Sequence, residues 1–545
     1  MGDDHIDFEL PMSQIAHEAF IANKTSLREY PMKDPSASPP QPGLTIEPRD
    51  AKHGKLINDP IHGAYRLDPA CTLIFDTPQF QRLRRLKQLG MTYYVFPGAS
   101  HNRFEHSLGV AHLAYRFANQ LWTSQRKELD IDRWDLRVVE LAGLCHDLGH
   151  GPFSHVFERE FLRRRGITGW EHEEMSGKIL NHIIDTNSID ALSPDVVNRI
   201  TSLITASSGE PSHQRQSKSQ WLSEVVANWR NSIDVDKFDY LARDSYYCGV
   251  RVACDFNRIM QFSRVIGDEI CYKWTEYMNL LELFHARASM HRNVYTHKKA
   301  KAIEFMVVDA LLEAEPALKL TEKIHNPEDF VRLDDGVLEF IENLDTNNND
   351  GIFTIDEGVH SAIRSSQKII DRLRRRKLYK FVTDAPIPDD IGALSNWKPP
   401  SPEDVAQYGG KNSSVKLRAE DIIVQENKIN YSMRNLNPLD NVHFYDYIGS
   451  TEKRTLKPQQ ISSMVAASFE EKRLRVYSRD PDPRYIAAVH EAFESWVKHR
   501  FGGAVTTSTP SKSRLHSTAL AFDGDGLNLP SRKRQKQLLY HIDSH

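Results

Sequence analysis

The sequence predicts a mainly α-helical protein with a smaller α+β region towards its C-terminus. Between about residues 55 and 320, apolar residues recur at spacings of three and four, and strand-like alternation is scarce. After residue 420, short β-like runs precede one further helix. The 545 residues, 40% of them hydrophobic, exceed one ordinary domain and suffice for a large core and a second, smaller unit.

The helical periodicity is clearest in the core region at residues 80–89, 104–121, 135–148 and 280–312. The β-like runs lie at residues 421–424, 428–431, 442–445 and 474–477, and the closing helix is expected at 483–500. Residues 372–380 form a basic amphipathic run, and a Pro-rich linker is expected at 386–402.

Four regions follow from these patterns. Residues 1–50 mix acids, prolines and serines and are expected to be a disordered arm. Residues 51–320 should form the helical core domain, and residues 321–502 a helical and α+β region. Residues 503–545 should be a disordered basic tail, whose cluster at 530–536 is either a nuclear-import signal or a chance feature.

Composition favours an intracellular protein, in the nucleus or the cytoplasm. None of the five cysteines belongs to a CxxC pair, so neither a zinc ribbon nor a disulfide framework is expected. We find no long apolar run and no signal-peptide pattern, so no membrane association is expected. The net charge of −4 argues against a global nucleic-acid footprint but allows local basic patches.

Residues 345–357 resemble a calcium-binding loop. With Gly351 at the turn position, however, the first ligand position falls on Thr346 instead of an acidic residue. A polar surface loop is therefore the better interpretation.

A group of polar side chains interrupts an apolar helical segment at residues 141–155. His146, Asp147, His150 and His155 lie there beside glycines and a proline. His146 and His150 are one helical turn apart and can share a face. A His-Asp pair alone is close to chance, but a satisfied core histidine does not explain four polar groups in one apolar segment.

Two further segments complete a candidate metal site. His106 and Arg103 lie one turn apart on one amphipathic helix, and Asp236 and Tyr240 lie one turn apart on another. Imidazole and carboxylate ligands without thiolates suit a divalent ion with open positions for water and phosphate oxygens, which predicts phosphoester hydrolysis. The adjacent Cys145 fits the apolar periodicity and is expected to be a buried structural thiol. The four candidate ligands are His106, His146, Asp147 and Asp236.

The order of these ligands resembles the HD-domain phosphohydrolase superfamily. The flanking segments are similar to one family in it, the sterile-alpha-motif/HD-domain deoxynucleoside triphosphate triphosphohydrolases, at residues 55–63, 76–84, 93–109 and 146–155. The resemblance implies a helical HD core with a C-terminal regulatory and oligomerisation region. It also implies metal-dependent hydrolysis of a dNTP to a deoxynucleoside and inorganic triphosphate, which controls dNTP pools. The sterile alpha motif itself is expected to be missing, because the 50 residues before the match do not suit it.

The resemblance also assigns catalytic roles. His155 would be the acid near the leaving 5′-oxygen, with His150 and His172 polarising or relaying protons. Glu158 stands where the family has an aspartate that supports the catalytic histidine. A transition metal, Fe, Zn or Mn, would occupy the four ligands, and Mg²⁺ would accompany the nucleotide phosphates.

For the substrate, the resemblance implies three basic residues that neutralise the triphosphate and three residues that hold the sugar and phosphates. It also implies a pair that meets the 3′-hydroxyl and crowds the 2′ position, which would select deoxyribose. Without the resemblance, residues 287, 291 and 295 would be an ordinary helical stripe. The basic residues that match the triphosphate contacts are Arg103, Lys237 and Arg287. The residues that match the sugar and phosphate contacts are Tyr240, Asp244 and Tyr295, and the pair at the 3′ and 2′ positions is Gln88 and Leu89.

The family is also a nucleotide-activated tetramer, so the resemblance implies GTP or dGTP and a dNTP as effectors, bound between subunits of a homotetramer. Departures from the family at Lys273, Thr275 and Thr296 leave effector affinity and specificity open. Without the resemblance, the basic run at 372–380 would be a solvated face. The guanine-binding matches are Lys55, Asn58, Asp76, Gln81, Arg82 and Arg84, and the other effector matches are Val95, Arg258, Asn279, His297, Lys298, Arg376, Lys380 and Lys457.

Two alternatives stay open from the sequence. Another HD hydrolase, such as a nucleotidase or a cyclic-nucleotide phosphodiesterase, would use the same ligands with a different pocket. A single-stranded nucleic-acid binding protein would use the basic run, although only Tyr379 and Phe381 offer stacking aromatics beside it. Weak binding of single strands is compatible with the enzyme.

Overall fold

The computed structural model describes residues 54–207, 219–344, 357–388, 397–409, 415–432, 435–457, 461 and 468–508. The expected N-terminal arm, the calcium-like loop and the basic cluster at 530–536 lie outside the described residues, apart from Glu357 at the end of the loop. Within the described part, no helix is both long enough and apolar enough to span a membrane.

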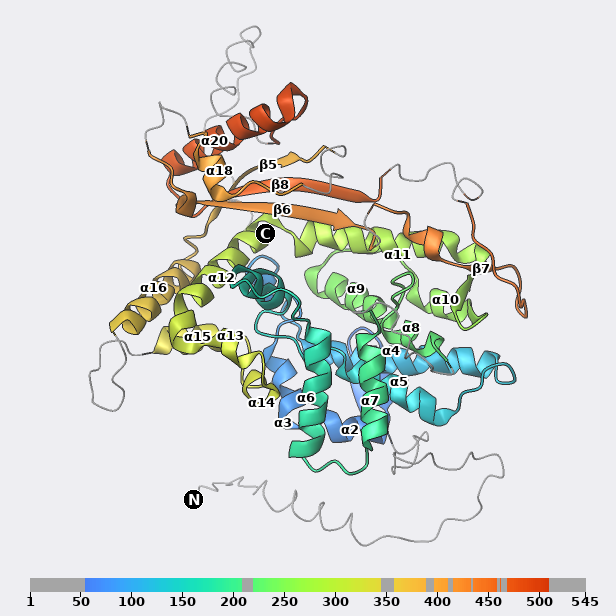
Figure 1. Cartoon of the computed structure of the whole chain (residues 1–545). Helices are drawn as coiled ribbons and strands as arrows, with labels where there is room; N and C mark the ends of the chain where they lie inside the picture. Colours follow the sequence, from blue (N-terminus) through green and yellow to red (C-terminus); the bar gives the residue numbers. More distant parts are fainter. Residues whose placement is uncertain are drawn as a thin grey trace, which may run out of the picture. The chain divides into compact units, whose positions relative to one another are not determined.

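Helices build most of the described chain (Figure 1). Helix α4 (Arg103–Ser124) begins with a capping box, in which the Asn102 side chain accepts from backbone N–H groups and Glu105 returns a bond to the Asn102 N–H. Helix α5 (Arg133–Cys145) begins in the same way at Asp132. Helix α9 (Val235–Cys248) packs with α5 around α4 and ends at Gly249, which takes the left-handed conformation that favours glycine.

The other helices, with η for 3₁₀ and π turns, are α2 (Pro69–Phe75), α3 (Pro78–Gln81), η1 (Arg82–Arg85), η2 (Gly90–Tyr94), η3 (Phe157–Leu162), α6 (His172–Thr186), α7 (Pro194–Ile204), η4 (Thr205–Ser207), α8 (Trp221–Val226), α10 (Phe256–Gln261), η5 (Trp274–Glu276), α11 (Tyr277–Met290), η6 (His291–Tyr295), α12 (Lys298–Leu318), α13 (Leu320–Lys323), α14 (Pro327–Phe330), α15 (Val337–Asn343), α16 (Glu357–Arg374), α18 (Pro402–Ala406), η7 (Ala419–Asp421), η8 (Pro438–Asn441), α20 (Pro483–Phe501) and η9 (Gly502–Ala504).

The strands form small sheets. One is an antiparallel pair, and in the second the last strand runs parallel to its neighbour. In the third, the central strand β8 pairs antiparallel with both β5 and β6, and α20 packs against β5 and β8 (Figure 1). The strands are β1 (Lys55–Asp59) and β2 (Gly63–Leu67); β3 (Ser263–Val265), β4 (Ile270–Lys273) and β7 (Phe444–Tyr445); and β5 (Lys380–Pro386), β8 (Glu470–Ser478) and β6 (Ile422–Asn430).

Two main apolar clusters support the mainly α fold with a smaller α+β part, which confirms the predicted fold class. The larger cluster is built on α4, α5, α9 and α12, whereas the smaller one lies between the third sheet, α18 and α20. The larger cluster does not end near residue 320, because Phe330, Ile370 and Tyr379 belong to it. The helices that follow residue 320 therefore share the core of the first region.

Three of the helices predicted by residue range were located correctly, α4, α5 and α20, although α5 ends at Cys145 and not at residue 148. The helix expected at 80–89 is wrong: only the turns α3 and η1 form, and Leu86 is already extended. The helix expected at 280–312 is interrupted at Thr296, between η6 and α12. The two runs expected at 421–424 and 428–431 are the single strand β6, and the short strands β1 to β4 were missed because they show too little alternation.

Candidate active site

Four polar side chains from three segments converge. His106 lies in the first turn of α4, Asp236 lies in the first turn of α9, and His146 and Asp147 directly follow α5. His106 Nε2 lies 3.1 Å from Asp236 Oδ1 and 3.5 Å from Asp147 Oδ2. His146 Nε2 lies 3.4 Å from Asp147 Oδ1 and 3.5 Å from Asp236 Oδ1. The structure therefore brings together all four predicted ligands.

The geometry of this cluster fits a divalent ion. Ligand atoms about 2.0–2.2 Å from a metal lie about 3.0–3.5 Å from one another in octahedral or tetrahedral arrangements. His146 Nδ1 lies 2.8 Å from the carbonyl oxygen of Gly143, so Nε2, which faces the carboxylates of Asp147 and Asp236, is the atom available to a metal ion. The Asp236 side chain is 31% exposed and that of His106 only 1%, so the cluster is open to solvent on the Asp236 side.

The charges of the cluster favour a cation. Burial lowers the pKa of His106, but the carboxylates of Asp236 and Asp239 outweigh burial and raise that pKa to about 10. Burial raises the pKa of Asp147, yet Arg103 and His146 hold that pKa well below its usual range. The imidazole of His106 holds a proton because carboxylates surround it. A bound metal ion would take the place of that proton.

A carboxylate behind the ligands was not predicted from the sequence. Asp239 Oδ2 lies 2.7 Å from His106 Nδ1, and Asp239 Oδ1 lies 2.6 Å from His62 Nε2. Arg243, one turn further along α9, donates to both oxygens of Asp239. Asp239 follows Asp236 at a spacing of three on the same helix, and this spacing was the signal that could have revealed it.

Gly109 leaves the space that Asp239 needs. A Cβ atom at this position would lie 2.0 Å from Asp239 Oδ1 and 2.5 Å from Arg243 Nη2. The glycine in the matched segment 93–109 therefore allows α4 and α9 to approach each other where His106 meets Asp239.

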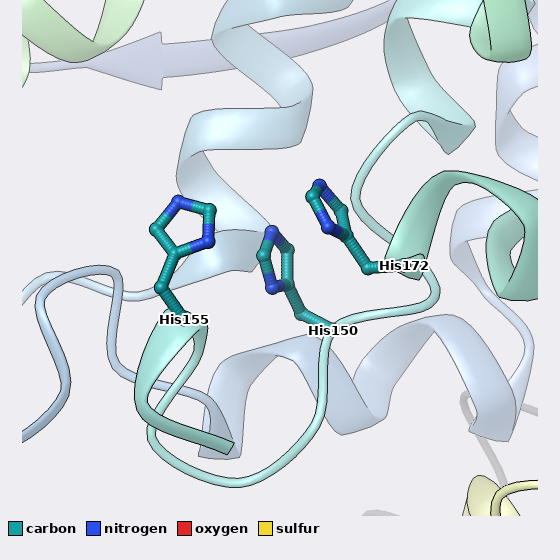
Figure 2. Close-up of side chains that lie close together, drawn as sticks. All are labelled: His150, His155 and His172. Carbon is teal, nitrogen blue, oxygen red and sulfur yellow. The ribbon is translucent and has the colours of Figure 1, made fainter. Parts of the chain in front are cut away.

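Three histidines, His150, His155 and His172, lie close together beside the candidate site, and Figure 2 shows their arrangement. The rings of His150 and His172 are stacked, with centroids 3.8 Å apart and an interplanar angle of 23°, and His155 meets His150 edge-on at 4.9 Å. Lone pairs of stacked rings lie in parallel planes and do not converge on one ion. This trio therefore fits proton transfer or hydrogen bonding to a ligand better than a second metal site.

The pKa values of two histidines of the trio shift in the opposite direction from that of the candidate ligand His106. Burial, followed by Arg103, holds the pKa of His150 well below its usual range, and desolvation by the surrounding residues, followed by Arg159, does the same for His155. The buried ring of His150 is therefore neutral at pH 7, whereas His155 is exposed to solvent. His150 Nε2 lies 3.3 Å from Asp147 Oδ1, which joins the trio to the metal ligands.

Glu158 contacts a histidine of the trio. Its Oε2 lies 2.9 Å from Nδ1 of His172, and we find no hydrogen bond from Glu158 to His155 among the described residues. Glu158 lies on the π turn η3, and the extra methylene of glutamate extends its reach to α6. The carboxylate at the position of the family's supporting aspartate therefore lies against His172.

The segment from His146 to Ser154 is not helical, whereas His155 and His172 each lie at the start of a helical segment. Helix α5 ends at Cys145, so His146 and His150 do not share a helical face, contrary to the prediction. Phe153 and Ser154 have φ values of 59° and 60°, an uncommon conformation for residues with side chains. A Cβ on Gly149 would lie 2.0 Å from the carbonyl oxygen of His172, so the glycine allows α6 to pack against this turn. Cys145 is buried, as predicted.

The expected phosphate-binding cations already have protein partners. Arg103 pairs with Asp147 at 2.5 Å and with Ser154 Oγ at 2.8 Å. Lys237 lies 3.2 Å from Asp234. Arg287 donates to the carbonyl oxygen of Asn430 at the end of β6, at 2.6 Å. Arg103 thus directly orients a metal ligand, which the sequence alone did not indicate.

The expected sugar contacts lie on α9, η6 and the turn before η2. Tyr295 donates to Asp244 Oδ2 at 2.7 Å, and the Tyr240 ring lies 6.4 Å from that of Tyr295. Gln88 is buried, and its Oε1 has no hydrogen-bond partner among the described residues. Leu89 is partly buried against the core. A buried acceptor without a partner next to a candidate active site is a place for a ligand donor.

Comparisons with known proteins agree with this geometry. The family model of the HD domain matches residues 103–244, which include all four candidate ligands. A deoxynucleoside triphosphate triphosphohydrolase SAMHD1 homolog of Dictyostelium discoideum is 41% identical over 82% of this chain and 81% of its own length. Deoxynucleoside triphosphate triphosphohydrolase SAMHD1 of Homo sapiens is 36% identical over 82% of this chain and 74% of its own length, and that of Gallus gallus is 35% identical over 82% and 75%.

The chain belongs to the SAMHD1 family of deoxynucleoside triphosphate triphosphohydrolases.

The residues that match the family's effector contacts lie in separate places in the described chain. Two pairs of them are hydrogen-bonded: Lys55 Nζ lies 3.2 Å from Asp76, and Arg84 Nε donates to Gln81 Oε1 at 2.7 Å. Asn58 is exposed on the same strand as Lys55. These side chains are therefore accessible to a nucleotide.

Arg82 does not fit the expected effector role. It is 6% exposed, and its guanidinium donates to the carbonyl oxygens of Leu333, Leu148 and His150. All three nitrogens are used inside the protein, so the assignment of Arg82 to a nucleotide contact is withdrawn. It holds the backbone of the segment that carries the histidine trio.

The other effector matches lie elsewhere in the described chain. Arg376 donates to the carbonyl oxygen of Tyr94, next to Val95, and His297 packs on Phe96. Lys298 lies over the Phe381 ring, beside Lys380. Arg258 and Asn279 both contact Glu276. Lys457 lies in the segment after β7.

Proposed function

We propose that this protein hydrolyses deoxynucleoside triphosphates to a deoxynucleoside and inorganic triphosphate, and that it thereby controls dNTP pools. The observation that carries the proposal is the convergence of His106, His146, Asp147 and Asp236 beside a trio of histidines. Relatives at up to 41% identity are named as deoxynucleoside triphosphate triphosphohydrolases, which supports the proposal.

His106, His146, Asp147 and Asp236 would hold a divalent transition metal, Fe, Zn or Mn, and Mg²⁺ would accompany the substrate phosphates. When bound, such an ion supplies an activated water and neutralises charge on the phosphate under attack. Asp239 holds the ring of His106, and Arg103 holds the carboxylate of Asp147, so that both face the ion.

His155 is the proposed proton donor to the leaving 5′-oxygen. Its side chain is exposed, and desolvation by the surrounding residues together with Arg159 lowers its pKa. A bound triphosphate carries several negative charges, and these would raise the pKa of His155 so that it is protonated when substrate is present. His150 and His172 stack beside it, and Glu158 orients His172.

Selection of the sugar is proposed to depend on residues 88 and 89. Gln88 presents an unpaired buried oxygen, and Leu89 is an apolar neighbour that offers no hydrogen bond to a 2′-hydroxyl. Arg103, Lys237 and Arg287 would neutralise the triphosphate by exchanging part of their present contacts for phosphate oxygens.

Activation by GTP or dGTP together with a dNTP is also proposed, with the effectors bound between subunits of a homotetramer. Within one chain the residues that match effector contacts lie in separate places. This separation supports the arrangement, because a single bound effector would then contact residues from more than one subunit. A nuclear location and weak binding of single-stranded nucleic acid stay predictions.

Product analysis tests the proposal. The full chain is incubated with each dNTP, with and without GTP, and products are separated by anion-exchange chromatography. Inorganic triphosphate and deoxynucleoside in equal amounts are expected. Release of phosphate or pyrophosphate instead would favour another HD hydrolase, and the metal content of the same preparation identifies the ion.

A further inference from the structure

We propose that His101 is a positioning residue that sets how strongly the site recognises the 3′-hydroxyl of its substrate. The inference rests on the proposed function, and His101 was not among the site residues predicted from the sequence.

The side chain of His101 holds Asp244. Its Nε2 lies 2.6 Å from Asp244 Oδ1, and neither side chain is more than 2% exposed. The ring is stacked on Tyr247, with centroids 4.6 Å apart and an interplanar angle of 9°. Because Tyr295 donates to the other oxygen of Asp244, both oxygens of this carboxylate are fixed in position. Each oxygen keeps a second lone pair for a ligand.

The backbone of His101 holds Gln88. The Gln88 N–H donates to the His101 carbonyl oxygen at 3.1 Å, and the Arg103 N–H donates to the Leu86 carbonyl oxygen at 2.9 Å. An antiparallel bridge between Lys87 and Asn102 lies between these two bonds. The register of the two segments therefore fixes where residue 88 lies relative to residue 101.

One residue thus sets the relative positions of two candidate sugar contacts, Asp244 by its side chain and Gln88 by its main chain. The carboxylate of Asp244 can accept the hydrogen of a hydroxyl, and the amide of Gln88, whose Oε1 is unpaired, offers both an acceptor and a donor, so a sugar hydroxyl is the ligand chemistry that suits them. The same bridge is followed directly by Arg103, which contacts the metal ligand Asp147. His101 therefore links the sugar contacts to the reacting centre without touching either the metal ligands or the phosphates.

The test compares two substrates, dCTP and 2′,3′-dideoxycytidine triphosphate, which lacks the 3′-hydroxyl. His101→Phe keeps a ring to stack on Tyr247 and removes the donor to Asp244. His101→Gln keeps a donor at the ε position and serves as the conservative variant. His443→Phe is the control, because His443 makes the same kind of pair, 2.7 Å from Glu269, away from the candidate site. All assays contain the same saturating GTP.

The wild-type protein should prefer dCTP to the dideoxy substrate in kcat/KM. His101→Phe should lower kcat/KM about 10- to 100-fold for dCTP and much less for the dideoxy substrate, so that the preference shrinks about tenfold. His101→Gln should restore part of the preference, and His443→Phe should keep all of it. If His101→Phe does not fold, His101→Asn replaces it, because its amide is too short to reach Asp244 from the same place.

The outcomes separate the two proposals. If the wild-type protein hydrolyses dCTP but His101→Phe lowers both substrates equally, or if the wild type does not distinguish them, the role of His101 is overturned and the proposed function stands. If the wild-type protein releases no triphosphate from dCTP, the proposed function fails, and this inference fails with it.

Discussion

Asp239 Oδ2 accepts a hydrogen bond from His106 Nδ1 at 2.7 Å. This bond leaves His106 Nε2 directed at Asp147 and Asp236, where a metal ligand must point. A carboxylate behind a ligating imidazole fixes both its orientation and its tautomer and increases its basicity. Asp239 is therefore as much a part of the candidate metal centre as the four candidate ligands.

Replacing this carboxylate tests its role. Asp239→Asn should lower the affinity for the metal about 10- to 100-fold, because the amide no longer holds the imidazole as a basic ligand. Metal content after dialysis against a chelator series measures the effect. Asp59→Asn is the matched control, because Asp59 contacts Arg243 and not His106. Equal metal retention in both variants would show that Asp239 does not support the ligand.

Asp236 is the ligand that can be removed with the least damage to the fold. Its side chain is partly exposed, and the cap of α9 belongs to Asp234. Asp236→Ala should therefore keep its circular dichroism spectrum but lose bound metal and hydrolysis of dNTPs. Asp185→Ala, at an exposed position of α6, should keep both. Full activity of purified Asp236→Ala would refute the metal site.

Arg82 and Arg84 should behave differently although both lie in the matched guanine-binding segment. Arg82→Lys leaves buried carbonyl oxygens without donors, so it should cost about 3 kcal/mol or more in the free energy of unfolding. Arg84 is exposed and stacks on Phe104, so Arg84→Gln should cost less than about 1 kcal/mol. Urea denaturation measures both changes.

The same pair tests the effector proposal. Arg84→Gln should raise the GTP concentration needed for half-maximal activity, because Arg84 is available to a nucleotide. If the folded Arg82→Lys protein shifts this concentration more than Arg84→Gln does, the structural role assigned to Arg82 is wrong.

Asp335 gives the protein a pH dependence near neutrality. Burial raises the pKa of Asp335 to about 7, although its carboxylate accepts the backbone N–H groups of Lys87 and Phe153. Because the folded-state pKa lies above that of the unfolded chain, the contribution of Asp335 to stability is full below about pH 4 and is lost as the pH rises through about 7.

Asp335→Asn removes this titration. The free energy of unfolding of the wild type minus that of Asp335→Asn should fall between pH 4 and 7, by at most about 1.4 kcal/mol per pH unit. Urea melts at several pH values measure the difference, which cancels titrations common to both proteins. A difference that is constant with pH would mean that the pKa of Asp335 is not raised.

Much of the fold and the identity of the metal ligands could be predicted from the sequence alone. Apolar spacing of three and four is a local property, so α4, α5 and α20 were located correctly by it. The chemical types of His106, His146, Asp147 and Asp236 indicated a metal site, because a group of imidazoles and carboxylates within apolar segments rarely has another role. Where the periodicity was short, as at residues 80–89, the prediction failed.

Only the tertiary structure decided the partners of these residues. His106 and Asp239 are 133 positions apart, and His101 and Asp244 are 143 apart, so no local pattern reports that they touch. The same holds for Glu158, which reaches His172 in α6, and for Arg82, whose charge lies inside the protein. The sequence determined which groups are available, whereas packing between distant helices decided which atoms face each other, because hydrogen bonds depend on distances that only the folded chain sets.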